Sequence, residues 1–151
     1  MCIRDRLKAI LSMAINFTKI IPTEDQVNEL YVLLKKREHS ISHKNIPSES
    51  DHYEFVSKNP YIVWYLIYKE KMPIGSVYVQ SDNSIGINLI DYYEQDVLDV
   101  INYIKDKHKP LSPIPSVRSN VFFINVASKN TKLIQILKEL EHREIQRSYL
   151  L

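Results

Sequence analysis

Glycine, cysteine and long apolar runs are all scarce in this sequence. Two of the 151 residues are glycine, whereas loops that cradle phosphate groups usually need several, because glycine lets the backbone approach the ligand closely. The single cysteine, Cys2, excludes an intrachain disulfide and makes the reducing cytoplasm the expected compartment. The longest apolar runs have about the length of a strand, so we expect no segment that spans a membrane.

An excess of charge of one sign is also missing. The chain carries 20 Lys and Arg against 18 Asp and Glu, a formal net charge of +2, whereas nucleic-acid-binding domains concentrate basic residues. We therefore expect no nucleic-acid partner. A metal site is not expected either. His39 and His43 stand four residues apart, as in the helical zinc motif, but Ser40 follows His39 where that motif places glutamate. Nothing in the sequence sets the oligomeric state.

What is present is ordinary globular composition, with 44% hydrophobic and 25% charged residues. A chain of this length can bury one core. The first twelve residues, "MCIRDRLKAILS", do not fit the pattern that follows, and "MCIRDR" resembles translated adapter sequence. We therefore expect residues 1–12 to be a non-native or disordered leader and residues 13–151 to form a single domain.

The hydrophobic pattern predicts about six strands and four helices, an α/β chain of the α+β type. The expected strands are 14–21, 61–69, 74–80, 84–90, 121–127 and 144–151, and the expected helices are 22–38, 47–59, 92–108 and 129–141. The run "YIVWYLIYK" is almost continuously apolar, which is typical of a central strand buried on both faces. Thr23 is the expected N-cap of the first helix.

The junction between strand 84–90 and helix 92–108 carries acids in place of glycines. Asp91 and Glu94 have the spacing of a capping box, with Asp91 at the N-cap and Glu94 three residues later. This spacing predicts that the helix satisfies its first N–H groups with its own carboxylates. Such a start would be a poor receptor for a diphosphate, because the N–H groups are taken and the charge has the wrong sign.

Three stretches resemble the GNAT acyltransferase superfamily. "PIGSVYV" and "SIGINLI" resemble its third and fourth strands, "FFINVASKNTKLIQILKEL" its fifth strand and following helix, and "REIQRSYLL" its closing strand. The resemblance implies a mixed, mostly antiparallel sheet flanked by helices, and transfer of an acyl group from acetyl-CoA, as co-substrate, to a small amine. The front of the chain looks like members that act on amino sugars.

The resemblance also implies where a site would lie. The coenzyme arm would pair with the backbone of a splayed fourth strand at Asn88, Leu89 and Ile90, near Asn125 and Asn130 at the end of the fifth strand. Arg37 and His43 are the expected substrate-binding residues, with His52 as another pocket histidine. The general base and acid are unassigned, and Tyr92, Tyr93 and His43 are the candidates. Basic residues of the loop 105–118 offer phosphate contacts from another direction.

Other positions depart from the family pattern. Across the expected diphosphate loop Glu94 replaces a basic residue, and the family's tyrosine acid in the last helix is replaced by Leu137. The sequence therefore leaves two hypotheses open. One is an acyl-CoA-dependent N-acyltransferase acting on a small amine. The alternative is a non-catalytic binding or regulatory module of the same fold that has lost coenzyme binding.

Overall fold

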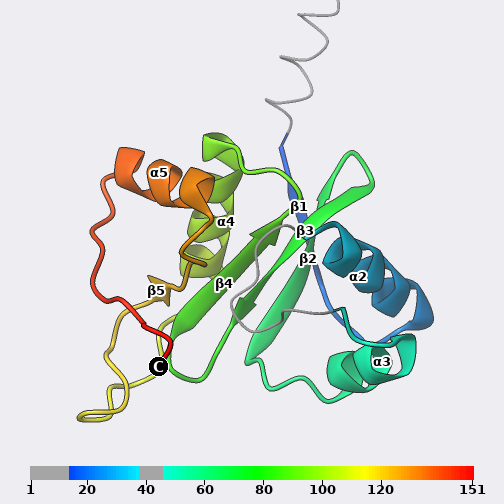
Figure 1. Cartoon of the computed structure of the whole chain (residues 1–151), viewed down its shortest axis with the longest axis horizontal. Coiled ribbons are helices and arrows are strands. Elements are labelled where there is room, and N and C mark those ends of the chain that lie inside the picture. The colour runs from blue at the N-terminus through cyan, green and yellow to red at the C-terminus, as the bar shows by residue number, and fades with distance from the viewer. Residues whose placement is uncertain (1–13, 38–45) are drawn as a thin grey trace, which may run out of the picture.

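A computed structural model describes residues 14–37 and 46–151. The expected leader, as well as His39 and His43, lie outside the described residues. The described chain forms three layers, with a sheet in the middle and helices on both of its faces (Figure 1). This arrangement confirms the predicted α/β fold class.

The sheet has five strands in the order β1-β2-β3-β4-β5. Their bounds are β1 (Asn16–Lys19), β2 (Val63–Lys69), β3 (Met72–Val79), β4 (Ser84–Leu89) and β5 (Phe123–Ile124). The first four strands are antiparallel neighbours, and β5 runs parallel to β4. The mixed, mostly antiparallel sheet is therefore confirmed. The apolar run 61–69 supplies the well-buried strand β2, as predicted.

Two helices cover each face of the sheet (Figure 1). They are α2 (Glu24–Lys36) and α3 (Glu49–Ser57) on one face, and α4 (Glu94–Lys107) and α5 (Thr131–Glu139) on the other. Thr23 caps α2 as predicted, since its side chain accepts a hydrogen bond from the Gln26 N–H. Alternate residues of β2 point to opposite faces, so Leu66 joins the core under α2 and α3 and Ile67 the core under α4 and α5.

The end of the chain departs from the prediction. The expected closing strand 144–151 is wrong, because these residues pair with no strand of the described chain. Ile145 and Tyr149 are 61% and 77% exposed, so the alternating pattern that suggested a strand buries nothing there. The expected strand 121–127 is reduced to the two residues of β5, which offers too short an edge for another strand to extend.

The predicted capping box at the start of α4 is also wrong. The helix begins at Glu94, Tyr93 is its N-cap residue, and no side chain of the described residues caps it. Asp91 lies outside the helix and is exposed. The physical reason is the burial of Tyr92, whose ring packs into the core while its hydroxyl bonds to β4. That contact keeps the residues after Asp91 out of the helix.

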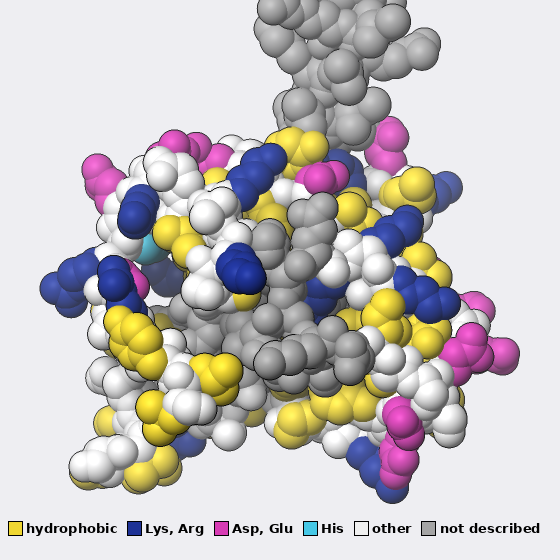
Figure 2. All heavy atoms as spheres, in the orientation of Figure 1, with side chains coloured by type: hydrophobic (Ala, Val, Ile, Leu, Met, Phe, Trp, Pro, Cys, Tyr) yellow, Lys and Arg dark blue, Asp and Glu magenta, His cyan; other side chains and the backbone are white. Residues whose placement is uncertain are grey.

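The surface is mixed in character. On the face shown in Figure 2, basic side chains are spread among acidic and apolar ones. Among the helices of the described residues, none has both the length and the apolar character needed to cross a membrane.

Candidate functional site

A narrow cleft opens where β4 and β5 separate. The two strands pair only at Ser84 with Phe123 and at Ile85 with Ile124. One further bond, from the Asn125 N–H to the Ile85 carbonyl at 3.4 Å, ends the contact. Beyond it lies a cavity of about 10 Å³, which is too small for more than a water molecule. Its walls are Arg37, Tyr78, Gly86, Ile87, Asn88, Tyr92, Asn125, Val126, Ala127, Asn130 and Leu133.

The Tyr92 hydroxyl occupies the β4 side of this cleft. It accepts a hydrogen bond from the Leu89 N–H and donates one to the Ile87 carbonyl, both at 3.3 Å. These two backbone groups face β5, because the alternate groups of β4, such as the Ile90 N–H, bond to β3. Tyr92 therefore satisfies the two groups that a parallel neighbour or an extended ligand would use.

The first turn of α4 lies close to two lysines. Lys69 of β2 and Lys132 of α5 hold their ammonium groups 5.3 Å and 5.2 Å from the centre of the Tyr93 ring. Lys69 also forms an ion pair with Asp96 at 2.8 Å. The acidic character predicted for this helix start is thus partly neutralised, and the exposed acids are Asp91 and Glu94.

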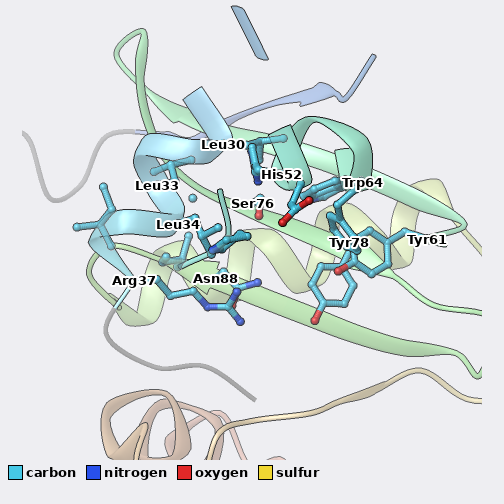
Figure 3. Close-up of a pocket in the computed structure, with 16 residues that line it drawn as sticks. Leu30, Leu33, Leu34, Arg37, His52, Tyr61, Trp64, Ser76, Tyr78 and Asn88 are labelled. Carbon is cyan, nitrogen blue, oxygen red and sulfur yellow. The ribbon is translucent and has the colours of Figure 1, made fainter. Parts of the chain in front are cut away.

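A larger cavity of about 290 Å³ lies between the sheet and the helices α2 and α3. Apolar and aromatic side chains dominate its lining, with a few polar groups among them (Figure 3). Its walls are Leu30, Leu33, Leu34, Arg37, Pro47, Asp51, His52, Phe55, Tyr61, Trp64, Gly75, Ser76, Tyr78, Asn88, Leu89 and Ile90. An apolar cavity with a small number of polar groups is the usual form of a small-molecule site.

His52 is the buried titratable group of this cavity. Its Nε2 lies 3.1 Å from the Val27 carbonyl oxygen, so Nε2 carries a proton and the lone pair of the neutral ring sits on Nδ1. Burial lowers the pKa of His52, and the ring is therefore neutral at pH 7. The indole Nε1 of Trp64 is also buried, and it has no hydrogen-bond partner in the part of the chain that the structure describes. It is a donor left for a ligand.

The two cavities meet at three residues, Arg37, Tyr78 and Asn88, which line both of them. Tyr78 reaches this junction by lying across Gly86, its partner in the β3–β4 register. A Cβ atom at position 86 would collide with the Tyr78 ring and hydroxyl. One of the two glycines in the chain is thus required by the aromatic ring beside it.

The structure brings several of the expected site residues together. Asn88 lines both cavities, Leu89 and Ile90 line the larger one, and Asn125 and Asn130 line the cleft. Asn130 also caps α5, since its side-chain oxygen accepts from the Leu133 N–H at 3.2 Å. The placement of His43 lies outside the described residues.

Three other expected parts of the site, Tyr92, Tyr93 and the loop 105–118, do not line the larger cavity. Tyr92 directs its hydroxyl to β4, and Tyr93 sits at the helix start between two lysines, so neither faces the larger cavity. The basic loop 105–118 follows the other end of α4, about 20 Å from the helix start for 14 residues. Within it, Arg118 bonds to the Ser112 and Ser81 carbonyls, and no residue of 105–118 lines either cavity.

Sequence reasoning missed Tyr78, Trp64 and the two lysines of the helix start. Tyr78 and Trp64 belong to expected strands whose apolar residues indicate core, and only the structure shows that both line a cavity. The signal that was available is Gly86, because an isolated glycine inside a strand often marks a close approach by a neighbour.

Comparison with known proteins supports the fold assignment. No protein-family model and no curated protein sequence matches the chain. An acetyltransferase from Thermus thermophilus matches with a TM-score of 0.62 at 9% identity, covering 89% of this chain and 90% of that one. An aminoglycoside acetyltransferase from an uncultured soil metagenomic sample gives 0.56 at 12% identity, covering 92% and 98%. The ribosomal L7/L12 alpha-N-protein acetyltransferase RimL, in complex with coenzyme A, gives 0.56 at 12% identity, covering 85% and 80%.

Proposed function

The chain has the fold of the GNAT acetyltransferases, and from this premise we propose that it transfers an acyl group from acyl-coenzyme A to a small amine. The observation that carries the proposal is the junction of the two cavities at Arg37, Tyr78 and Asn88. A thioester held in the cleft would meet there an amine held in the larger cavity. Acyl transfer needs this meeting of two reactants in one place.

The coenzyme arm would enter the cleft and replace the Tyr92 hydroxyl on β4. The Leu89 N–H would then donate to a carbonyl of the arm, and the Ile87 carbonyl would accept from an amide of the arm. Both groups are already oriented toward the cleft and are engaged only by hydrogen bonds of 3.3 Å. The arm would have to displace two side-chain hydrogen bonds, which is a smaller cost than separating a paired strand. The thioester, at the far end of the arm from the diphosphate, would lie farther along β4 toward Gly86.

The coenzyme diphosphate would lie at the start of α4. No side chain among residues 14–37 and 46–151 caps this helix, so its first N–H groups and the positive end of its dipole offer a place for an anion. Lys132 adds a positive charge beside the helix start, and Lys69 neutralises Asp96. Asp91 and Glu94 oppose binding, but both are exposed, where water and salt screen the repulsion.

The larger cavity would hold the acceptor. Trp64 and the stacked rings of Tyr61 and Tyr78 offer aromatic surface. Asp51 offers an anion for an ammonium group, and Arg37 offers a cation for an anionic substituent. An amino sugar suits this lining, because a sugar ring can lie against aromatic faces while its hydroxyl groups bond to Trp64 Nε1 and Ser76. Two of the matching structures are aminoglycoside acetyltransferases, which supports this class of acceptor.

The reaction would be a direct attack. The neutral amine nitrogen would bond to the thioester carbonyl carbon, and the developing oxyanion would accept a hydrogen bond from a backbone N–H of β4 that faces the cleft. Neutral His52, in the same cavity, is the group best suited to accept the proton that the amine must lose. We also propose a cytoplasmic location for this activity.

The test is binding first and turnover second. Acetyl-CoA at about 100 times its Kd should raise the unfolding free energy by ~2.7 kcal/mol, which is a rise of several degrees in Tm at this size. Amine acceptors, beginning with amino sugars, are then screened by release of the free thiol. Absence of a Tm shift with acetyl-CoA, succinyl-CoA and coenzyme A would leave the non-catalytic module as the better account.

A further inference from the structure

We propose that Tyr78 is the general acid that protonates the leaving thiolate in the acyl transfer. This inference rests on the proposed function and names a residue for one of its steps. The tyrosine that serves as acid in the resembling family is replaced here by Leu137, which packs against the core. Another donor is therefore required, and it must stand where the coenzyme and acceptor cavities meet.

The position of Tyr78 meets that requirement. Its ring projects from β3 across Gly86 of β4, so its hydroxyl lies over the strand that borders the cleft. Tyr78 lines the cleft and the larger cavity alike. It shares this position with Arg37 and Asn88, and neither of those can supply a proton near neutral pH, since guanidinium loses its proton only above about pH 12 and a carboxamide does not titrate. Among the described residues at the junction, Tyr78 is thus the group able to give up a proton reversibly.

The ring is held in place by two neighbours. Tyr61 stacks on it with a centroid distance of 4.0 Å and an interplanar angle of 9° (Figure 3). Gly86 of β4 lies against the hydroxyl end of the ring. A catalytic group needs such fixation, because a misplacement of about 1 Å can cost 10²-fold in rate.

The surroundings also keep the proton on the phenol until it is needed. Burial raises the pKa of Tyr78, and the nearby Arg37 charge works in the opposite direction. The phenol is thus protonated at neutral pH and has a cation nearby to stabilise the phenolate once the proton has left. These are the properties of an acid that acts once and is restored by solvent.

The step balances without any further reactant. The amine nitrogen forms a bond to the carbonyl carbon, and the carbon–sulfur bond breaks with its electron pair going to sulfur. The Tyr78 O–H gives its proton to that sulfur and yields the free thiol. The amine proton passes to His52 or water, and the phenolate regains a proton from solvent.

The experiment compares the wild-type chain with Tyr78→Phe. Phenylalanine keeps the ring over Gly86 and the stack on Tyr61, and it removes only the hydroxyl. The probe amine is hydroxylamine, which is small, uncharged at neutral pH and independent of the acceptor class, and thiol release from acetyl-CoA is followed. Tyr53→Phe is the matched control, because Tyr53 is 54% exposed and lines neither cavity.

We expect Tyr78→Phe to lower kcat by about 10²-fold or more, with the Kd for acetyl-CoA changed less than about threefold and Tyr53→Phe at the wild-type rate. The pH–rate profile of the wild type should have an alkaline limb, in which the rate falls as Tyr78 loses its proton. The profile of Tyr78→Phe should lack this limb. A second variant with 3-fluorotyrosine at position 78 keeps the fold and has a more acidic phenol. Its alkaline limb should move to lower pH.

The outcomes separate the two proposals. A Tyr78→Phe variant that keeps its kcat, or a fluorotyrosine variant whose limb does not move, overturns the assignment of Tyr78 and leaves acyl transfer standing. A wild-type chain that binds no acetyl-CoA, or binds it and releases no thiol to hydroxylamine, overturns the proposed function itself and the acid with it.

Discussion

Lys69 of β2 and Asp96 of α4 form an ion pair of 2.8 Å, with 10% and 2% of their side chains exposed. The second carboxylate oxygen of Asp96 is buried and has no partner among the described residues. The pair ties the end of β2 to the first turn of α4, beside the cleft. Because both charges are out of water, each depends on the other.

We expect Asp96→Asn to destabilise the protein by about 3–5 kcal/mol, because it leaves the Lys69 charge buried and unpaired. Urea unfolding measures the change. Glu54→Gln is the control, since the Lys58–Glu54 pair is 77% and 66% exposed and its loss should cost about 0.5 kcal/mol or less. Equal losses of unfolding free energy in both variants would mean that the buried pair contributes no more to stability than the exposed one.

Removal of the Tyr92 hydroxyl should have opposite effects on the free and the bound protein. Tyr92→Phe removes two hydrogen bonds to β4 from the free form, while the bound form already has the coenzyme arm in their place. We expect a lower Tm without ligand and an affinity for acetyl-CoA about fivefold higher, which corresponds to about 1 kcal/mol. Calorimetric titration measures the affinity.

The control for this variant is Tyr103→Phe, because the Tyr103 ring stacks on Phe17 of β1 and lines neither cavity. Its affinity for acetyl-CoA should match that of the wild type. Weaker binding by Tyr92→Phe would show that the hydroxyl contacts the coenzyme and is not displaced by it.

The charges at the start of α4 should act on the diphosphate. Glu94→Gln should tighten the binding of coenzyme A, and Lys132→Ala should weaken it, each by about 1 kcal/mol or roughly fivefold at low salt. Pantetheine, which has no diphosphate, should bind both variants as it binds the wild type. Equal effects on coenzyme A and pantetheine would place the diphosphate elsewhere.

The free energy of unfolding should decrease as the pH falls below 6.5. Burial lowers the pKa of both His52 and His108 from the ordinary value of 6.5. Below pH 6.5 the unfolded chain therefore binds protons that the folded chain does not bind. The stability present above pH 6.5 is lost as the pH falls toward the folded pKa values. Urea unfolding between about pH 7.5 and 5.5 measures the slope, and His52→Gln should reduce it. A slope that His52→Gln leaves unchanged would mean that this imidazole is not excluded from protonation.

Much of the fold could be predicted because its signals are local. The apolar run of β2 and the cap at Thr23 depend on a few neighbouring residues, and both stand in the structure. The capping box at Asp91 was an equally local signal, and it failed because burial of Tyr92 competes with it. The strand 144–151 failed for a related reason, since alternation predicts a strand only where a neighbouring edge exists.

The candidate site was harder to predict, because its geometry depends on register. The residues that meet at the junction come from the end of α2, the end of β3 and the end of β4. Asn88 could be named from the resemblance and Arg37 from the chemistry of its guanidinium group, whereas Tyr78 has no motif of its own. Its role depends on which residue stands opposite, and the register of β3 and β4 supplies Gly86.

The contact between Tyr78 and Gly86 makes two positions of the chain evolve together. Any side chain at position 86 requires a smaller residue at position 78. A homologue with a larger residue at 86 must therefore lack the tyrosine at 78. A substitution at 86 alone would thus silence the chemistry without removing a single reacting group. Relatives that keep the activity should carry the pair intact, and relatives that have lost it should be free to vary at both positions.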